Sequence, residues 1–116
     1  MTKKTATKPI GKRCAAGTMM GTKGSIYVAG PINGNPNYKA AFLNAAAELR
    51  REGWTVYSPT ELDITDISQR QMYGLELGWI TQQATAIYML KGWEHSVGAQ
   101  AEWAVARALG LRIYYE

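Results

Sequence analysis

The stretch LKGWEHSVGAQAEWAVARALG, residues 90–110, holds the residues whose types and spacing could support chemistry. Its second half is typical of an alanine-rich helix, and one narrow side of that helix collects Gly98, Glu102, Val105 and Leu109. A carboxylate on such a small, apolar side is costly unless it is paired or used. Ser96 precedes the helix, where backbone N–H groups favour anions. The stretch therefore predicts an anion site beside a half-buried carboxylate.

Glu102 is the candidate catalytic residue, and the sequence leaves two interpretations of it open. It is either a nucleophile facing a bound ligand, or a structural residue that stabilises the start of its helix or pairs with an arginine. Trp93, in the preceding loop, either stacks on a planar base or packs in the interior. His95 is expected to be exposed. With one histidine and one cysteine the chain has no metal-ligand constellation, and Ser96 has no partners for a catalytic triad.

A second candidate is the turn GPINGN, residues 30–35, which follows the β-rich run SIYVAG. Its glycines let the backbone approach a ligand closely. The turn lacks the Gly-Lys-Ser/Thr end of a P-loop and the GxGxxG pattern of dinucleotide sites. It is either a structural turn or a contact for a phosphate or sugar. The candidate substrate-binding residues in it are Gly30, Pro31, Ile32, Asn33 and Gly34.

Short β-rich runs alternate with helical segments along the chain. The expected strands are 25–30, 54–59, 86–90 and 111–115, and the expected helices are 38–52, a segment from Asp66 or Ser68 to about 83, and the alanine-rich segment after Ser96. This alternation predicts a parallel sheet of about four to five strands with helices on both faces. Ligands of such sheets bind at the carboxyl ends of the strands. The loops at that edge add Ser58, Pro59, Trp93, Ser96 and Gly98 to the candidate substrate-binding residues.

The 116-residue chain is 47% hydrophobic and 19% charged, which is typical of one small globular domain. A single cysteine, Cys14, excludes an internal disulfide and suits a reducing, cytoplasmic compartment. No apolar run approaches the roughly 20 residues of a membrane span, and no apolar core of a secretory signal follows the basic first residues.

The net charge of +4 comes from one end of the chain. Residues 1–24 hold six Lys/Arg and no acid, whereas the remainder holds seven Lys/Arg and nine Asp/Glu, a difference of −2. Residues 1–24 show no hydrophobic periodicity and are predicted to be a disordered basic tail, with the folded domain in residues 25–116. Such a tail could contact nucleic acid weakly, but a basic segment of this kind is more often only a solvated extension, so nucleic acid is an unlikely partner.

Three segments together resemble the nucleoside 2-deoxyribosyltransferase superfamily: SIYVAGPINGN, WTVYSP and QQATAIYMLKGWEHSVGAQAEWAVARALGLRIYY. The likeness covers residues 25–116 and is closest to small phage and bacterial relatives with an AGP-x-x-G start and a GW-x-x-S-x-GA-x-x-E segment. The chain is also similar to 2′-deoxynucleoside 5′-monophosphate N-glycosidases. The resemblance implies a flavodoxin-like α/β fold and no cofactor. It also implies homo-oligomers, for which Trp103 beside Arg107 on an outward helix face is the candidate contact.

The resemblance also implies roles for individual residues. Glu102 stands where the family has its nucleophile toward the sugar C1′. Ser96 stands where the monophosphate enzymes bind the 5′-phosphate with a serine. Asn33 replaces an arginine found in their base and sugar loop. Thr85 stands where the family is expected to have a catalytic aspartate, for which Asp63, Asp66 or Glu76 is a possible substitute.

We therefore expect a domain that acts on the N-glycosidic bond of a (deoxy)nucleoside or its 5′-monophosphate. The reaction would be transfer to another base or hydrolysis. The alternative is a non-catalytic binder or sensor of a nucleotide-derived ligand. Thr85 favours the binder, and Glu102 favours the enzyme.

Overall fold

Four parallel strands form one sheet in the order β2-β1-β3-β4. They are β1 (Gly24–Ala29), β2 (Trp54–Tyr57), β3 (Ala86–Met89) and β4 (Arg112–Tyr115). The computed structural model describes residues 23–62 and 64–116. Most of the predicted basic tail, residues 1–22, lies outside the described residues, and Gly24 already belongs to β1.

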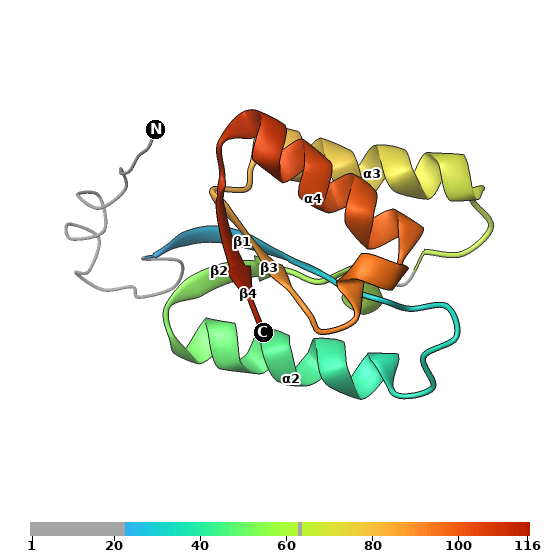
Figure 1. Ribbon diagram of the computed structural model, residues 1–116, viewed down its shortest axis with the longest axis horizontal. Coiled ribbons are helices and arrows are strands. Elements are labelled where there is room, and N and C mark those ends of the chain that lie inside the picture. The colour runs from blue at the N-terminus through green and yellow to red at the C-terminus, as the bar shows by residue number, and fades with distance from the viewer. Residues whose placement is uncertain (1–22, 63) are drawn as a thin grey trace.

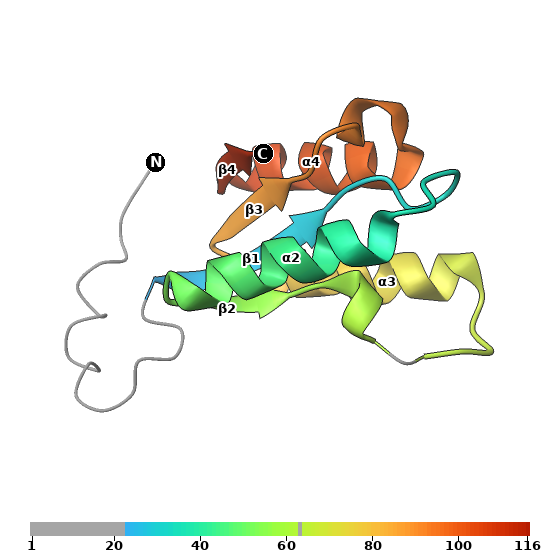
Figure 2. The ribbon, with the colours of Figure 1, turned by 90° about the horizontal axis from the view of Figure 1, so that it is seen from below.

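Three α-helices cover the two faces of the sheet, which gives a three-layer α/β/α arrangement. Helix α2 (Tyr38–Arg51) lies on one face, and α3 (Gln69–Gln82) and α4 (Val97–Leu109) lie on the other (Figures 1 and 2). Two short 3-10 helices, η2 (Pro59–Glu61) and η3 (Trp93–His95), follow β2 and β3. The predicted flavodoxin-like α/β topology is confirmed, with four strands. Within the described residues, no helix has the length and apolar character that crossing a membrane requires.

The helix boundaries follow from local capping. Ser68 begins α3, because its side chain accepts the N–H of Gln71 while the Gln71 side chain accepts the N–H of Ser68. Asp66, the alternative start, does not cap the helix. Ser96 caps α4 by accepting the N–H of Ala99 at 3.2 Å. Gly110, in the left-handed conformation with φ 74°, ends α4.

The core has two parts, one on each face of the sheet. On the α2 side, Ile26 and Val28 of β1 pack against Phe42 and Leu49. On the other side, Tyr27, Ile87 and Met89 pack against α3 and α4. Because β1 is central and covered on both faces, its side chains are buried whichever way they point. A polar side chain within β1 therefore needs a partner inside the protein.

Helix α4 packs on the sheet through a side that differs from the predicted one. Its buried residues are Ala99, Glu102 and Ala106, whereas Leu109 is 48% exposed. The predicted side is rotated toward α3, since Gly98 lies against the Tyr73 ring. Small residues bring α4 close to the sheet, and a large leucine is excluded from that contact. The sequence places Glu102 and Leu109 on the same apolar side of the helix. Glu102 is buried there, whereas Leu109 is exposed.

Trp103 is half-buried, so its predicted position on an outward face also needs correction. Its ring lies 5.1 Å from that of Trp93, and the Arg107 guanidinium lies 4.9 Å from it on the helix. Its Nε1 donates to the Tyr115 hydroxyl at 2.9 Å. The indole is therefore held by aromatic and hydrogen-bonding neighbours within its own chain, and it is not a free contact surface.

Candidate active site

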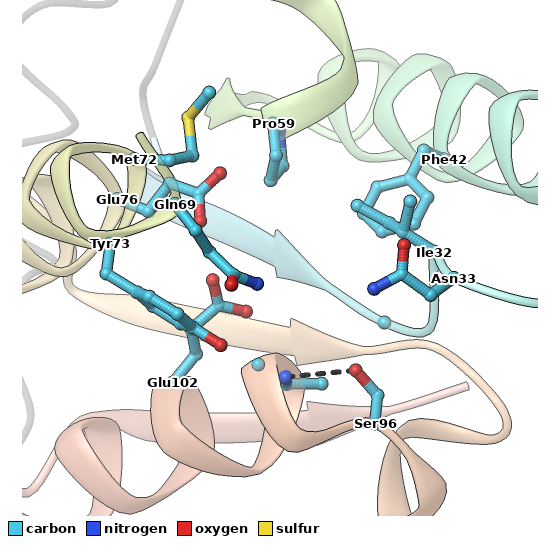
Figure 3. Close-up of a pocket in the computed structure, with 13 residues that line it drawn as sticks. Ile32, Asn33, Phe42, Pro59, Gln69, Met72, Tyr73, Glu76, Ser96 and Glu102 are labelled. Carbon is cyan, nitrogen blue, oxygen red and sulfur yellow. Dashed lines mark hydrogen bonds between the residues drawn. The ribbon is translucent and has the colours of Figure 1, made fainter. Parts of the chain in front are cut away.

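A cavity of about 220 Å³ opens where β1, β2 and β3 end, between α2, α3 and α4 (Figure 3). The cavity therefore lies at the carboxyl ends of the strands, where the sequence predicts the ligand site. The cavity is lined by Gly30, Ile32, Asn33, Phe42, Pro59, Gln69, Met72, Tyr73, Glu76, Ser96, Gly98, Ala99 and Glu102. These described lining residues include two carboxylates and no lysine, arginine or histidine.

Glu102 is the most buried charged group of the site, with 5% of its surface exposed. Its Oε2 accepts a 2.6 Å hydrogen bond from the hydroxyl of Tyr27 in the central strand. The Tyr27 ring is itself fixed, since it stacks on Tyr57 at 5.3 Å and lies 6.2 Å from Trp79. A rigid donor thus holds one oxygen of the carboxyl, and the other side of the group faces the cavity.

Glu76 of α3 is the second carboxyl of the cavity and lies across from Glu102 (Figure 3). Burial raises the pKa of Glu102 to about 8; the Tyr27 bond opposes this rise, and the charge and hydrogen bond of Glu76 add to it. Burial also raises the pKa of Glu76. Two carboxyls this close titrate as a pair that shares one proton near neutral pH. The pair can therefore act as a base and an acid at once.

The wall at the α4 N-terminus is suited to a negatively charged group. The Ser96 hydroxyl lines the cavity while it caps the helix, and Gly98 leaves the first turn open on that side. Helix N-terminal N–H groups and the helix dipole favour an anion there. Apolar side chains form the opposite wall: Ile32, Phe42, Pro59 and Met72. The cavity thus has an anion-accepting end, an apolar end, and the carboxyl pair between them.

Most of the predicted site residues meet in this cavity. Those that line it are Gly30, Ile32, Asn33, Pro59, Ser96, Gly98 and Glu102. Four others do not line it. Pro31 lies beside Gly92. Gly34 is at an exposed turn with φ 78°. Ser58 is buried, with its Oγ 3.4 Å from the Thr60 hydroxyl. Trp93 packs on Trp103 and Tyr115, in agreement with the interpretation that it packs against other side chains and does not line the ligand site. His95 is exposed, as predicted.

Of the α3 residues, only Glu76 is expected near the site from the sequence, as a possible acid, whereas Gln69, Met72 and Tyr73 also line the cavity. Gln69, Met72, Tyr73 and Glu76 follow one another at intervals of three, one and three residues, which places them on one helix face. That periodicity was a usable signal for a shared surface. Tyr27 was also missed, although a tyrosine among aliphatic residues in a central strand predicts a buried hydroxyl that needs a partner.

Thr85 lies at the other end of the sheet from the cavity. It precedes β3, and its Oγ1 accepts the N–H of Ser25 and donates to the Ser25 carbonyl, each at 3.1 Å. The cavity begins after the strands, about 16 Å away for five extended residues. Thr85 does not line the cavity, whereas Glu76, one of the three possible substitutes, lines it across from Glu102. Asp66 is exposed outside the cavity, and Asp63 lies outside the described residues.

Thr85→Val is expected to lower the free energy of unfolding by about 1 kcal/mol. The reason is that the change removes two hydrogen bonds between the Thr85 hydroxyl and the main chain of Ser25. Denaturant unfolding measures the loss. An unchanged free energy of unfolding would show that the Thr85 hydroxyl does not help to hold β1 and β3 together.

No cluster of three histidine, cysteine or acidic residues suited to a metal ion occurs in residues 23–62 and 64–116. A search of curated proteins finds no match to this chain. One family model, described as Domain of unknown function (DUF4406), matches residues 24–115, which is the domain that carries β1 to β4 and the cavity. On that match, the chain belongs to the DUF4406 family.

Proposed function

We propose that the protein cleaves the N-glycosidic bond of a 2′-deoxynucleoside or its 5′-monophosphate, with Glu102 as the nucleophile. The observation that carries this proposal is the Glu102–Glu76 carboxyl pair in the cavity, with Tyr27 holding Glu102 in place. Glycosidic bond cleavage with retention needs two carboxyls, one that attacks the sugar and one that protonates the leaving group. The resemblance to nucleoside 2-deoxyribosyltransferases also supports Glu102 as the nucleophile.

The shared proton supplies both roles. Burial raises the pKa of both carboxyls, that of Glu102 to about 8, and at rest the pair shares one proton. Its transfer to Glu76 leaves a carboxylate on Glu102, which the Tyr27 hydroxyl stabilises by its 2.6 Å hydrogen bond. Glu102 then attacks C1′ while the C1′–N bond breaks, and Glu76 donates its proton to the leaving base. The products of this step are a sugar ester of Glu102, the free base and an ionised Glu76.

The ester is then resolved at C1′. Ionised Glu76 accepts a proton from water, or from an incoming base, which attacks C1′ and releases the Glu102 carboxylate. Water gives hydrolysis and a base gives transfer, and both restore the single shared proton. Within this scheme Glu76 is first the acid and then the base. The binder alternative rested on the absence of an acid at Thr85, and Glu76 supplies that group.

The two ends of the cavity fit the two ends of such a ligand. The sugar 5′ position is directed to Ser96 and the start of α4, and the base lies toward Ile32, Phe42 and Met72. An apolar slot suits a planar base, and helix N–H groups suit phosphate oxygens. Asn33 and Gln69 bring amide groups to the mouth of the cavity. Amides can donate to and accept from a base edge at once.

Incubation with deoxynucleosides and their 5′-monophosphates, followed by chromatography for free base, tests the proposal. Release of base that depends on Glu102 supports it. Saturable binding of the same compounds without any release, measured by calorimetry, would instead identify a binder. Adding a second free base distinguishes transfer from hydrolysis, because transfer yields a new nucleoside.

Ser96→Asp is expected to weaken binding of a monophosphate by roughly 1–3 kcal/mol and to leave nucleoside binding nearly unchanged. The added carboxylate repels phosphate, while aspartate caps a helix as well as serine does, so α4 keeps its start. Titration calorimetry with the two ligands measures the difference. Equal weakening of both would show that the 5′ end is not bound at Ser96.

A further inference from the structure

The two edges of the sheet differ in how they are protected. At the β2 edge, Arg50 donates from Nη2 to the Val56 carbonyl at 3.2 Å, and Glu61 holds the guanidinium at 2.7 Å. That carbonyl faces away from β1, since the Gly53 carbonyl, three residues earlier, accepts from Lys23 on the β1 side. At the β4 edge, no side chain among the described residues bonds to the main-chain groups of Ile113 or Tyr115. The Glu116 carboxylate accepts the Lys91 N–H at 2.8 Å, and its second oxygen makes no hydrogen bond within the described residues. An open strand edge is a template for pairing with another strand.

The main-chain groups available at the β4 edge belong to two residues. The N–H of Glu116 donates to the Met89 carbonyl of β3, so the ladder continues to residue 116. Since successive residues of a strand point their main-chain groups to opposite sides, Arg112 and Tyr114 also face β3. Ile113 and Tyr115 therefore present their N–H and C=O groups to the outside.

The sequence at this edge is Arg-Ile-Tyr-Tyr-Glu over residues 112–116. When a second copy runs antiparallel to it, Arg lies opposite Glu, Ile opposite Tyr, and the central Tyr opposite its own equivalent. Arg112, Tyr114 and Glu116 share one face of the strand, and Ile113 and Tyr115 share the other. Tyr114 and Tyr115 are two of the large apolar side chains that the domain exposes, at 36% and 54%. Opposite charges stand two residues on either side of Tyr114.

We propose that β4 pairs with β4 of a second copy of the chain, antiparallel and centred on Tyr114, to form one eight-stranded sheet across a two-fold axis. The N–H and C=O groups of Ile113 then exchange hydrogen bonds with those of the second copy's Tyr115. Tyr115 does the same with the second copy's Ile113. Arg112 faces the second copy's Glu116 at each end. Tyr114 meets its own equivalent on the axis. The same surface serves both copies, as a two-fold interface requires.

This alignment is the one that satisfies every constraint of the edge. A shift by one residue would turn the apolar face of one copy onto the opposite face of the other. A shift by two, centred on Ile113, would set Arg112 against Tyr114 and leave both charges without a partner. Centring on Tyr114 also sets the two copies of Tyr114 opposite each other with no main-chain hydrogen bonds between them. This agrees with the N–H and C=O groups of Tyr114 facing β3.

Sedimentation of the parent chain and of three further samples tests the charge pairing; the three are two charge variants, each alone, and their equal mixture. Arg112→Glu places two acids opposite each other at both ends, and Glu116→Arg does the same with two bases, so each variant alone is expected to dissociate at least about tenfold more readily than the parent chain. An equal mixture of the two variants restores both opposite-charge pairs and is expected to form the heterodimer. A monomeric parent chain, or dimers that all three samples form equally, would overturn the proposal.

Oxidative cross-linking tests the position of the axis. With Cys14 replaced by serine, Tyr114→Cys is expected to form a disulfide-linked dimer, because facing side chains without main-chain hydrogen bonds have Cα atoms about 4.5 Å apart. Tyr115→Cys is the matched control, since position 115 faces Ile113 and not its own equivalent. Cross-linking at 115 with none at 114 would overturn the alignment.

Discussion

Glu102→Gln is expected to reduce the rate of base release by about 10³-fold or more while ligand affinity changes little. Glutamine keeps the shape of the side chain and can still accept the Tyr27 hydrogen bond, but it has no attacking oxygen anion. Single-turnover assays and calorimetry measure the two quantities. Glu48→Gln on exposed α2 is a matched control for the chemical change and should retain the parent rate. A Glu102→Gln protein that releases base at the parent rate would remove the mechanism.

The same variant is expected to be more stable than the parent at alkaline pH. Burial raises the pKa of Glu102 from the ordinary value of 4.5 to about 8, so the folded state binds this proton more tightly than the unfolded chain does. The stabilisation by the proton is complete below pH 4.5 and is lost as the pH rises through about 8. Glutamine stays neutral throughout. Its free energy of unfolding at pH 9 should exceed that of the parent by at least about 1.4 kcal/mol, the equivalent of one pKa unit.

Denaturant unfolding at pH 5 and pH 9 separates this expectation from a structural role. If Glu102 only stabilises its helix as a charged group, the glutamine variant should be less stable at both pH values by about 1 kcal/mol. The two interpretations thus predict changes of opposite sign at pH 9. Only the first fits a carboxyl kept buried for chemistry.

Glu76→Gln is expected to lower the rate on natural nucleosides by about 10²–10⁴-fold, the usual contribution of a general acid. A glutamine amide cannot take the Glu102 proton and pass it to the departing base. The loss should be much smaller on a 4-nitrophenyl 2-deoxyriboside at pH 9, where Glu102 is already ionised without Glu76 and the leaving group needs no proton. Glu102→Gln should stay inactive on both substrates, because the nucleophile is needed in each. Equal losses on both substrates for Glu76→Gln would assign Glu76 to a role other than the acid.

The parent should also lose activity as the pH rises through about 8, because the carboxyl pair then loses its shared proton and no acid remains. This alkaline fall in kcat/KM on natural nucleosides should be much weaker on the 4-nitrophenyl substrate. Rate profiles between pH 5 and pH 10 on the two substrates measure it. A fall of the same size on both would point to a group that acts on the nucleophile or the fold instead.

The sequence by itself determined the order of elements and the position of Glu102. Short β-rich runs marked the strands, and Ser96 and Ser68, the latter as one of two alternatives, marked the helix starts, because capping depends on residues within a turn of each other. The parallel arrangement followed from the alternation of strands and helices. It also placed the site at the carboxyl ends of the strands, where the cavity lies.

Only the tertiary structure decided which carboxyl meets Glu102. Glu76 and Tyr27 lie 26 and 75 residues from it in sequence, and they reach it through the packing of α3 and α4 on one face of the sheet. Local sequence patterns predict which side of a helix is buried. The angle at which two helices pack decides which side chains of one helix contact those of the other. That angle depends on the side chains of every layer together, and no short stretch of this sequence contains it.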